Sequence, residues 1–353
     1  MGSKKLTIYA PDIHEGDAVG NHCIGVAKLA SRLGFSVKLY AKNYSYDSQD
    51  ITIKSIERFL NEVSSDEFIF VSYSIFDPCL ERILRLPNRK VCYFHDVTPP
   101  NLLREHDPAT AILCEMALQQ LSSLSEFDVF ISNSEQSASL LKKAGINDRI
   151  NVIPPVFGNS FIFSKKVGQI RKSGLETINL LSVGRVVPHK RIEDSISVLS
   201  KLSVLDGGKY RLRVVGSIPN KEYFKFLINR ARKLNVLQYV TFCGMVSQID
   251  LDYLFESSQV LISMSDHEGF CIPILEAMYL GIPLVLKKGT AADEFAATVA
   301  MNVRDVEGAV EEILSHLENN NGLERFTELT EQASLVLERT NDNHWAKIFN
   351  NAE

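Results

Sequence analysis

The sequence of 353 residues has no hydrophobic run approaching 18 residues, and its start, MGSKKLTIYAP, leads from two lysines directly into a strand-like segment without a signal-peptide core. We therefore expect neither a membrane-spanning helix nor a secretory leader. The six cysteines are scattered without a C-x-x-C pair, so we expect reduced thiols in a cytoplasmic protein. The net charge of −5 is spread over the whole chain, and it gives no support for nucleic-acid binding.

Strand-like and helix-like segments alternate along the chain in two series. Strands are predicted at 6–10, 36–41, 68–74, 91–94, 128–132, 151–153, 179–183, 211–215, 240–242, 260–263 and 284–286. Helices are predicted at 20–33, 108–124, 193–205, 221–234, 250–256 and 273–280. This alternation predicts an α/β protein with two Rossmann-like, doubly wound parallel sheets facing a central cleft, where open α/β sheets bind ligands.

The periodic pattern is lost between residues 156 and 176, where Gly, Ser and Lys become frequent, as they do in interdomain linkers. We predict an N-terminal domain at 1–160, a C-terminal domain at 161–325 and a helical tail at 326–353. The tail contains the only tryptophan, Trp345.

The stretch Asp266–Glu276, DHEGFCIPILE, is the most informative part of the sequence. It follows an apolar run and begins a predicted helix. Pro273 suits the first turn of that helix, where a missing N–H costs nothing. Gly269 lets the backbone approach a ligand, and the amides that follow it would point from the helix N-terminus toward a phosphate or sugar oxygen. Two carboxylates, Glu268 and Glu276, stand eight positions apart, so they can hold two parts of one long polar ligand.

The segment SVGRVVPHKR places two cations, Arg185 and Lys190, five residues apart after a predicted strand. Ends of parallel strands direct side chains toward a ligand, and positive charge there stabilises a diphosphate leaving group. Basic residues in a loop are usually only solvated, and that interpretation stays open for this segment taken by itself.

The order E-G-F-x-x-P-x-x-E-A-M, followed by G-x-P, resembles the E-x7-E signature of retaining glycosyltransferases of family 4, which share the GT-B fold. The resemblance implies that Glu276 binds the ribose hydroxyls of a nucleotide sugar and that Glu268 contacts hydroxyls of the transferred hexose. SVGRVVPHKR is similar to the G-R-x-x-x-x-K element of the family, in which the positions of Arg185 and Lys190 hold the donor pyrophosphate. The resemblance also implies that the final helix, in 326–353, crosses back to the N-terminal domain.

Two weaker segments are also similar to elements of this family. VTFCG resembles the V-x-F-x-G strand whose end frames the nucleobase, and Gly216 resembles a glycine that ends an earlier strand, although an apolar strand ended by Gly is often plain architecture. The resemblance predicts these donor-binding residues: Gly16, Arg185, Lys190, Gly216, Val240, Cys243, Gly244, Met245, Glu268, Gly269, Phe270, Cys271, Ile272 and Glu276. It predicts these catalytic residues: His95, Arg185, Lys190 and Glu268.

The N-terminal half contributes two candidate segments. VCYFHDVTPP brings His95 and Asp96 to the end of a strand. The resemblance implies that His95 donates a hydrogen bond to the sugar, while Asp96 either positions the acceptor or forms a turn. HEGDAVGNH resembles the family's glycine-rich loop, with Gly16 on the donor and Asp17 on the acceptor side, although its glycines are four residues apart instead of adjacent. A flexible turn is the alternative.

Asp250-Leu251-Asp252 spells D-x-D, which binds a divalent metal in a different transferase fold. Here the triplet opens a short helix, where capping and first-turn carboxylates explain it. We therefore expect no metal and no cofactor besides the substrate nucleotide sugar.

The predicted function is cytoplasmic, retaining hexosyl transfer in polysaccharide biosynthesis, with UDP-glucose as the best guess for the donor and a saccharide or glycolipid as the acceptor. GDP-mannose is the rival donor, and a non-catalytic nucleotide-sugar sensor is the alternative from another class. A nicotinamide dehydrogenase is not supported, because G-x-G-x-x-G is missing after the first strand. A lipid-linked acceptor would place the protein at the inner membrane face, with weak peripheral association.

Overall fold

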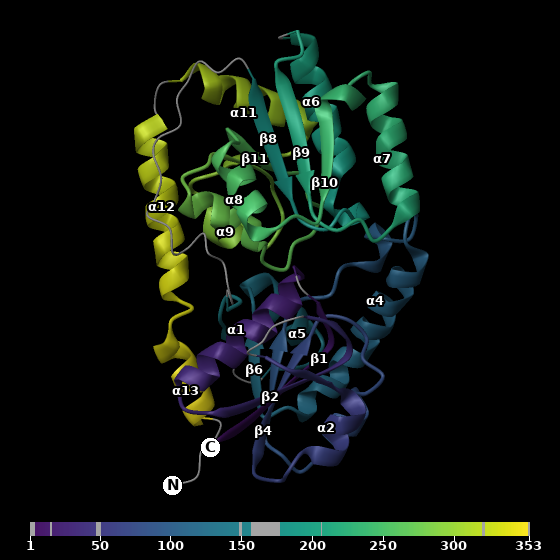
Figure 1. The fold of residues 1–353 in the computed structure, drawn as a ribbon, viewed down its shortest axis with the longest axis vertical. Helices are drawn as coiled ribbons and strands as arrows, with labels where there is room; N and C mark the ends of the chain where they lie inside the picture. The colour runs from purple at the N-terminus through teal and green to yellow at the C-terminus, as the bar shows by residue number, and fades with distance from the viewer. Residues whose placement is uncertain are drawn as a thin grey trace. The chain divides into compact units, whose positions relative to one another are not determined.

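The computed structural model describes residues 4–14, 16–46, 51–147, 150–156, 177–205, 207–319 and 322–351. Its described residues form two compact units, each built on a parallel sheet with helices (Figure 1). The first unit draws on Met1–Val97, Ile112–Ser160 and Leu337–Glu353, and the second on Thr98–Ala111 and Phe161–Val336.

The sheet of the first unit has the strand order β3-β2-β1-β4-β5-β6-β7 with every pairing parallel. Its strands are β1 (Lys5–His14), β2 (Ser36–Ser45), β3 (Ile53–Ser55), β4 (Glu67–Tyr73), β5 (Lys90–Phe94), β6 (Val129–Ser132) and β7 (Ile150–Val152). The helices along this part of the chain are α1 (Ala18–Arg32), α2 (Ile56–Glu62), α3 (Leu80–Leu84), α4 (Pro108–Gln120) and α5 (Glu135–Lys143). The central strands are apolar on both faces, as parallel strands covered by helices are, and β5 is buried at every position.

The last helix, α13 (Asp342–Asn351), packs against the first unit. Trp345 is fully buried there and stacks on Tyr93 with ring centroids 6.0 Å apart. Figure 1 shows α13 beside α1, and an ion pair between Arg32 and Asp342 joins the two helices at 2.8 Å. The only tryptophan of the chain therefore belongs to the core of this unit.

The sheet of the second unit has the strand order β10-β9-β8-β11-β12-β13, again with every pairing parallel. Its strands are β8 (Ile178–Val183), β9 (Tyr210–Val215), β10 (Val240–Gly244), β11 (Val260–Ser263), β12 (Leu284–Lys287) and β13 (Met301–Val303). Its helices are α6 (Ile192–Leu205), α7 (Lys221–Lys233), α8 (Gln248–Glu256), α9 (Ile272–Tyr279), α10 (Asp293–Ala296), α11 (Val306–Glu318) and α12 (Gly322–Glu338). Apolar residues of the strands and of α6, α7 and α11 form its core.

The prediction of two doubly wound parallel sheets is confirmed. The division of the chain differs from the predicted one at Thr98–Ala111, which joins the second unit. The contacts of His106 explain this, because its carbonyl accepts a hydrogen bond from Asn220 at 2.6 Å and its ring packs on Tyr223 and Phe226. Most of α12 also belongs to the second unit, so only the segment from Leu337 onward joins the first.

The elements without a predicted counterpart are β3, α2, α3, α5, α10, β13 and α11. The predicted helix 108–124 ends early, with a 3₁₀ turn at Leu121–Glu126. The short strands carry too few residues for a periodic signal to be detected. Across the described part of the chain, no helix is both long enough and apolar enough to span a bilayer.

Candidate functional site

Glycines lie at the carboxyl ends of three neighbouring strands of the second unit. Gly184 and Gly216 follow β8 and β9, Gly244 ends β10, and their φ angles are 146°, 139° and 66°. The amide of Gly216 donates to the Gly244 carbonyl at 2.9 Å. A Cβ on Gly216 would lie 2.1 Å from the Gly184 carbonyl oxygen, so only glycine lets these strand ends meet so closely.

An ion pair between Lys190 and Glu268 lies beside these strand ends. The Lys190 ammonium is 2.7 and 2.6 Å from the two Glu268 carboxylate oxygens, and the Ser265 hydroxyl donates to the same carboxylate at 2.7 Å. Only 18% of the lysine and 6% of the glutamate side chain is exposed. Burial by itself lowers the pKa of Lys190, but the Glu268 charge overrides it, and the pKa ends above its ordinary value. The lysine therefore stays charged at neutral pH.

The loop between β11 and α9 carries the E-x7-E segment. Pro273 lies in the first turn of α9, as the sequence predicted, and Glu276 lies one turn inside the helix and is buried. Cys271 precedes the helix in a left-handed conformation, with φ at 75°. Burial and the neighbouring Glu268 charge raise the pKa of the Cys271 thiol to about 12, so this thiol is neutral and not a nucleophile at physiological pH.

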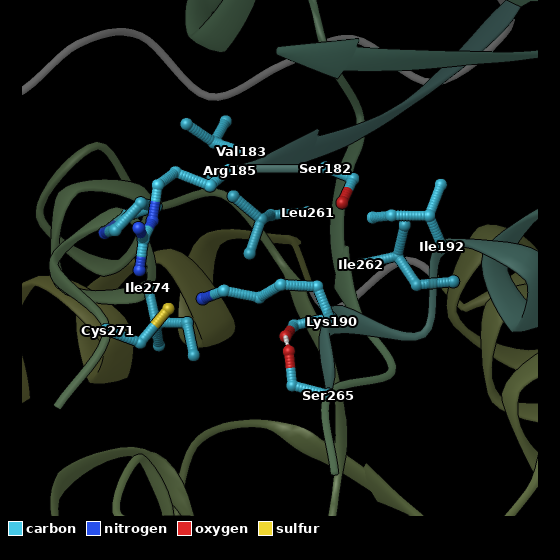
Figure 2. Close-up of a pocket in the computed structure, with 13 residues that line it drawn as sticks. Ser182, Val183, Arg185, Lys190, Ile192, Leu261, Ile262, Ser265, Cys271 and Ile274 are labelled. Carbon is cyan, nitrogen blue, oxygen red and sulfur yellow. Dashed lines mark hydrogen bonds between the residues drawn. The ribbon is translucent and has the colours of Figure 1, made fainter. Parts of the chain in front are cut away.

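A narrow cavity runs between these elements, with a volume of about 10 Å³, room for roughly one water molecule. Figure 2 shows the Lys190 side chain crossing it toward the side where Arg185 and Cys271 lie. Arg185 is exposed at its rim. A nucleotide sugar does not fit inside this cavity.

A second set of contacts fixes the Lys190 loop to the Glu268 loop. The Asp266 amide donates to the His189 carbonyl at 2.8 Å, and the Asp266 carboxylate lies 3.6 Å from Arg191 Nε. Arg191 has a left-handed backbone, φ 50°, and also binds Asp194 at 3.0 Å. Ser265, Asp266 and Arg191 were not among the predicted site residues. The charges of Asp266 and Arg191 are a signal that could have pointed to those two, and Ser265 carries none.

The remaining predicted donor-binding residues of this unit occupy different environments. Val240 and Cys243 are half-buried in β10, Gly269 and Ile272 are half-buried around the start of α9, and Met245 is 57% exposed. Phe270 is 6% exposed and stacks on Phe295 with centroids 4.8 Å apart, so its ring serves packing.

The predicted residues of the N-terminal half all lie in the first unit. His95 Nε2 is 2.7 Å from the Ser72 hydroxyl, and burial lowers the pKa of His95 to about 3. Asp96 is buried with φ at 83°; its carboxylate accepts hydrogen bonds from the Ser137 hydroxyl at 3.0 Å and the Val97 amide at 2.7 Å. These contacts correspond to the local turn role, which the sequence had left open beside the acceptor role.

At the start of α1, Asp17 caps the helix by accepting hydrogen bonds from the Val19 and Gly20 amides at 3.1 and 3.3 Å. Gly16 is exposed with φ at 74°, a conformation that favours glycine. The segment thus forms a capped βα turn, and the acceptor role of Asp17 stays a prediction.

The D-x-D triplet lies at the start of α8. The Asp250 amide and carboxylate both contact the Ser247 hydroxyl, and Asp252 accepts from Gln248 at 2.8 Å. The contact between Ser247 and Asp250 is a helix cap, as the sequence predicted. Within the described ranges, no group of three His, Cys, Asp or Glu side chains could hold a metal ion.

Comparison with known proteins places this geometry in context. A family model described as "Glycosyl transferases group 1" matches residues 167–333. The chain is 27% identical over 150 residues to the O-antigen chain mannosyltransferase B of Escherichia coli, which covers 42% of this chain and 39% of that protein. The chain thus spans well under half the length of this curated relative.

Two solved structures share the fold over nearly the whole chain. One is WaaG, a glycosyltransferase involved in lipopolysaccharide biosynthesis, with a TM-score of 0.71 and 14% identity, covering 97% of this chain and 99% of that one. The other is HepE of Anabaena in complex with UDP and glucose, with a TM-score of 0.74 and 15% identity, covering 98% and 99%. The chain therefore has the GT-B fold, as predicted. The matched family and the named relative are transferases, which supports the prediction of a transferase enzyme.

Proposed function

We propose that this chain is a retaining glycosyltransferase that moves a hexose from a nucleoside diphosphate sugar to a saccharide or glycolipid acceptor in polysaccharide biosynthesis. One observation carries the proposal. Arg185, Lys190 and Glu268 gather at glycine-ended strands of the second unit, inside the segment that matches group 1 glycosyltransferases. Open α/β sheets bind their ligands at this edge.

The Lys190–Glu268 ion pair suggests how a donor would bind. A diphosphate carries more negative charge than one carboxylate, so it would draw the Lys190 ammonium toward itself, with Arg185 as the second cation. The Glu268 carboxylate would then lose its lysine partner and could accept hydrogen bonds from the hexose hydroxyls. It would keep its hydrogen bond from the Ser265 hydroxyl. Glu276 would bind the ribose.

Charge that develops on the leaving diphosphate is stabilised most by cations that already face it. We propose that Arg185 and Lys190 have this role without a metal ion, and that the leaving diphosphate takes the proton of the acceptor hydroxyl as the new bond forms on the same face. His95 is neutral at physiological pH because its pKa is about 3, so it would donate a hydrogen bond to the sugar without transferring a proton.

UDP-glucose is our first choice of donor. GDP-mannose is the second, because one relative is named a mannosyltransferase. We propose that the reaction takes place in the cytoplasm, at the inner membrane face where the acceptor is lipid-linked.

The test is a thermal-shift screen of the protein against a panel of nucleotide sugars, followed by detection of nucleotide released from the donor that binds. We expect one donor to raise the melting temperature and to be turned over. Binding without release of nucleotide in the presence of an acceptor panel would instead support a sensor, and stabilisation by no nucleotide sugar would refute the proposal.

A further inference from the structure

A second, larger cavity lies wholly within the first unit and has a volume of about 200 Å³. One side is polar: Asp12 comes from β1, and Lys42 and Asn43 come from β2. Asp12 and Asn43 are register partners, and the Asn43 amide donates to the Asp12 carboxylate at 2.8 Å. These residues lie toward the carboxyl ends of two central parallel strands, the edge at which α/β sheets bind ligands.

The other side of the cavity is apolar. Phe76 and Pro78 come from the segment after β4, and Leu113 comes from α4. On α4, Leu113 and Met116 are 40% and 36% exposed, and they are neighbours on one helix face because they are three residues apart. Leu113, at the cavity, and Met116 therefore form an exposed apolar strip on α4.

A buried carboxylate, Asp77, stands between the lining residues Phe76 and Pro78 in the sequence. One of its oxygens accepts from the Tyr9 hydroxyl and the Cys79 amide, while the other has no hydrogen-bond partner within the described part of the chain. The charges of Lys42 and Asp12 both act on it. Asp77 does not itself line the cavity, so it is a buried polar group behind the lining and makes no contact with a ligand there.

We propose that this cavity binds the acceptor, and that the acceptor is a neutral sugar joined to an apolar chain. The inference rests on the proposed function and names the acceptor class for it. The single cation and single carboxylate of the lining balance one another, which favours an uncharged ring, and together with the Asn43 amide they offer hydrogen-bond partners for hydroxyls. The carbon face of the ring lies against Phe76, and the apolar chain follows Leu113 and Met116.

None of these residues belongs to the donor site of the second unit, so the two sites can be tested apart. The probes are the methyl and hexyl glycosides of glucose, galactose and mannose, below their micelle concentrations, with binding followed by saturation-transfer NMR. We expect a hexyl glycoside to bind about tenfold more tightly than its methyl counterpart, because part of the alkyl chain leaves water. Asn43→Ala and Lys42→Ala should each weaken binding about fivefold to tenfold through lost hydrogen bonds.

Two further variants sharpen the test. Leu113→Trp fills the cavity from an exposed helix position and should abolish binding without unfolding the protein. Lys142→Ala, an exposed lysine of α5 outside the cavity, is the matched control for Lys42→Ala and should bind as the wild type does. Three results would each overturn the proposal: no glycoside binds, methyl and hexyl glycosides bind equally, or Asn43→Ala and Leu113→Trp bind as tightly as the wild type.

A thermal-shift measurement with UDP-glucose and GDP-mannose on the same samples separates this inference from the proposed function. Wild-type protein that binds glycosides but neither nucleotide sugar would refute the proposed function. Protein that binds a nucleotide sugar normally but fails the glycoside tests would refute only the acceptor site.

Discussion

Replacing Lys190 by alanine removes one partner of a buried ion pair and, in our account, the cation that faces the leaving diphosphate. The Lys190 ammonium lies within 2.7 Å of both Glu268 oxygens, and the glutamate side chain is only 6% exposed. Loss of the lysine leaves a buried carboxylate that still accepts the hydrogen bond of the Ser265 hydroxyl but has no cation beside it from position 190. Breaking such a pair costs about 3 to 5 kcal/mol, and the partial exposure of Lys190 places the expected loss near the lower value, about 3 kcal/mol.

The expected effect on turnover is larger than that on acceptor binding. Removing one preorganised donor that stabilises developing negative charge lowers kcat by about 10²-fold to 10³-fold. Urea unfolding gives the stability of the Lys190→Ala variant, and the rate of nucleotide release gives its turnover. Lys225→Ala is the matched control: that lysine lies 3.8 Å from Glu222 in an exposed pair, so its loss should cost less than about 1 kcal/mol and leave kcat unchanged.

A double variant, Lys190→Met with Glu268→Leu, distinguishes a structural from a catalytic role. Replacing both charges by apolar groups should restore most of the lost stability, while turnover should stay low. Wild-type turnover in Lys190→Ala would refute the catalytic role. Recovery of turnover together with stability in the double variant would show that the lysine acts only in folding.

Three further predictions concern single features of the two units. Gly216→Ala should destabilise the protein and weaken nucleotide-sugar binding, because its Cβ would lie 2.1 Å from the Gly184 carbonyl oxygen. The control is Gly145→Ala, which also has a positive φ but has open space around it. This control should leave nucleotide-sugar binding unchanged in thermal-shift assays. Trp345→Ala should cost about 3 to 5 kcal/mol in urea unfolding followed by circular dichroism, and a loss below about 1 kcal/mol would contradict its place in the core. Burial lowers the pKa of His95 to about 3 from an ordinary 6.5, so between these two pH values the unfolded chain binds more protons than the folded protein. The free energy of unfolding should therefore fall by up to about 1.4 kcal/mol per pH unit as the pH drops below about 6.5. If the unfolding midpoint of His95→Gln depends on pH as strongly as that of the wild type, this prediction is wrong.

Much of the fold could be predicted because parallel strands buried on both faces read as continuous apolar runs. The predicted strand at 260–263 matches β11, and the helix predicted at 273–280 is offset by one residue from α9. β13 was missed because three residues carry no periodicity. The grouping of Thr98–Ala111 with the second unit depends on contacts of His106 with residues more than a hundred positions away, and sequence patterns do not encode such contacts.

The sequence predicted the charged residues of the candidate site but not which of them contact one another. The motifs pointed to Lys190 and Glu268 separately, one for phosphate and one for sugar, and the structure shows that they bind one another across 78 positions. From the sequence, an aspartate at position 17 or 96 fits both ligand binding and capping of backbone amides. In the structure, both carboxylates accept hydrogen bonds from nearby backbone amides. The cavity beside Asp12 and Lys42 gave no motif, because its lining comes from four separate segments.

Isothermal titration calorimetry with UDP-glucose and with GDP-mannose tests most directly whether the second unit holds an activated sugar. We predict that the wild-type protein binds one of the two, and that Glu276→Ala binds it about tenfold to a hundredfold more weakly, the cost of losing hydrogen bonds to one carboxylate. Absence of binding heat for both nucleotide sugars, or equal affinity in the variant, would contradict the account.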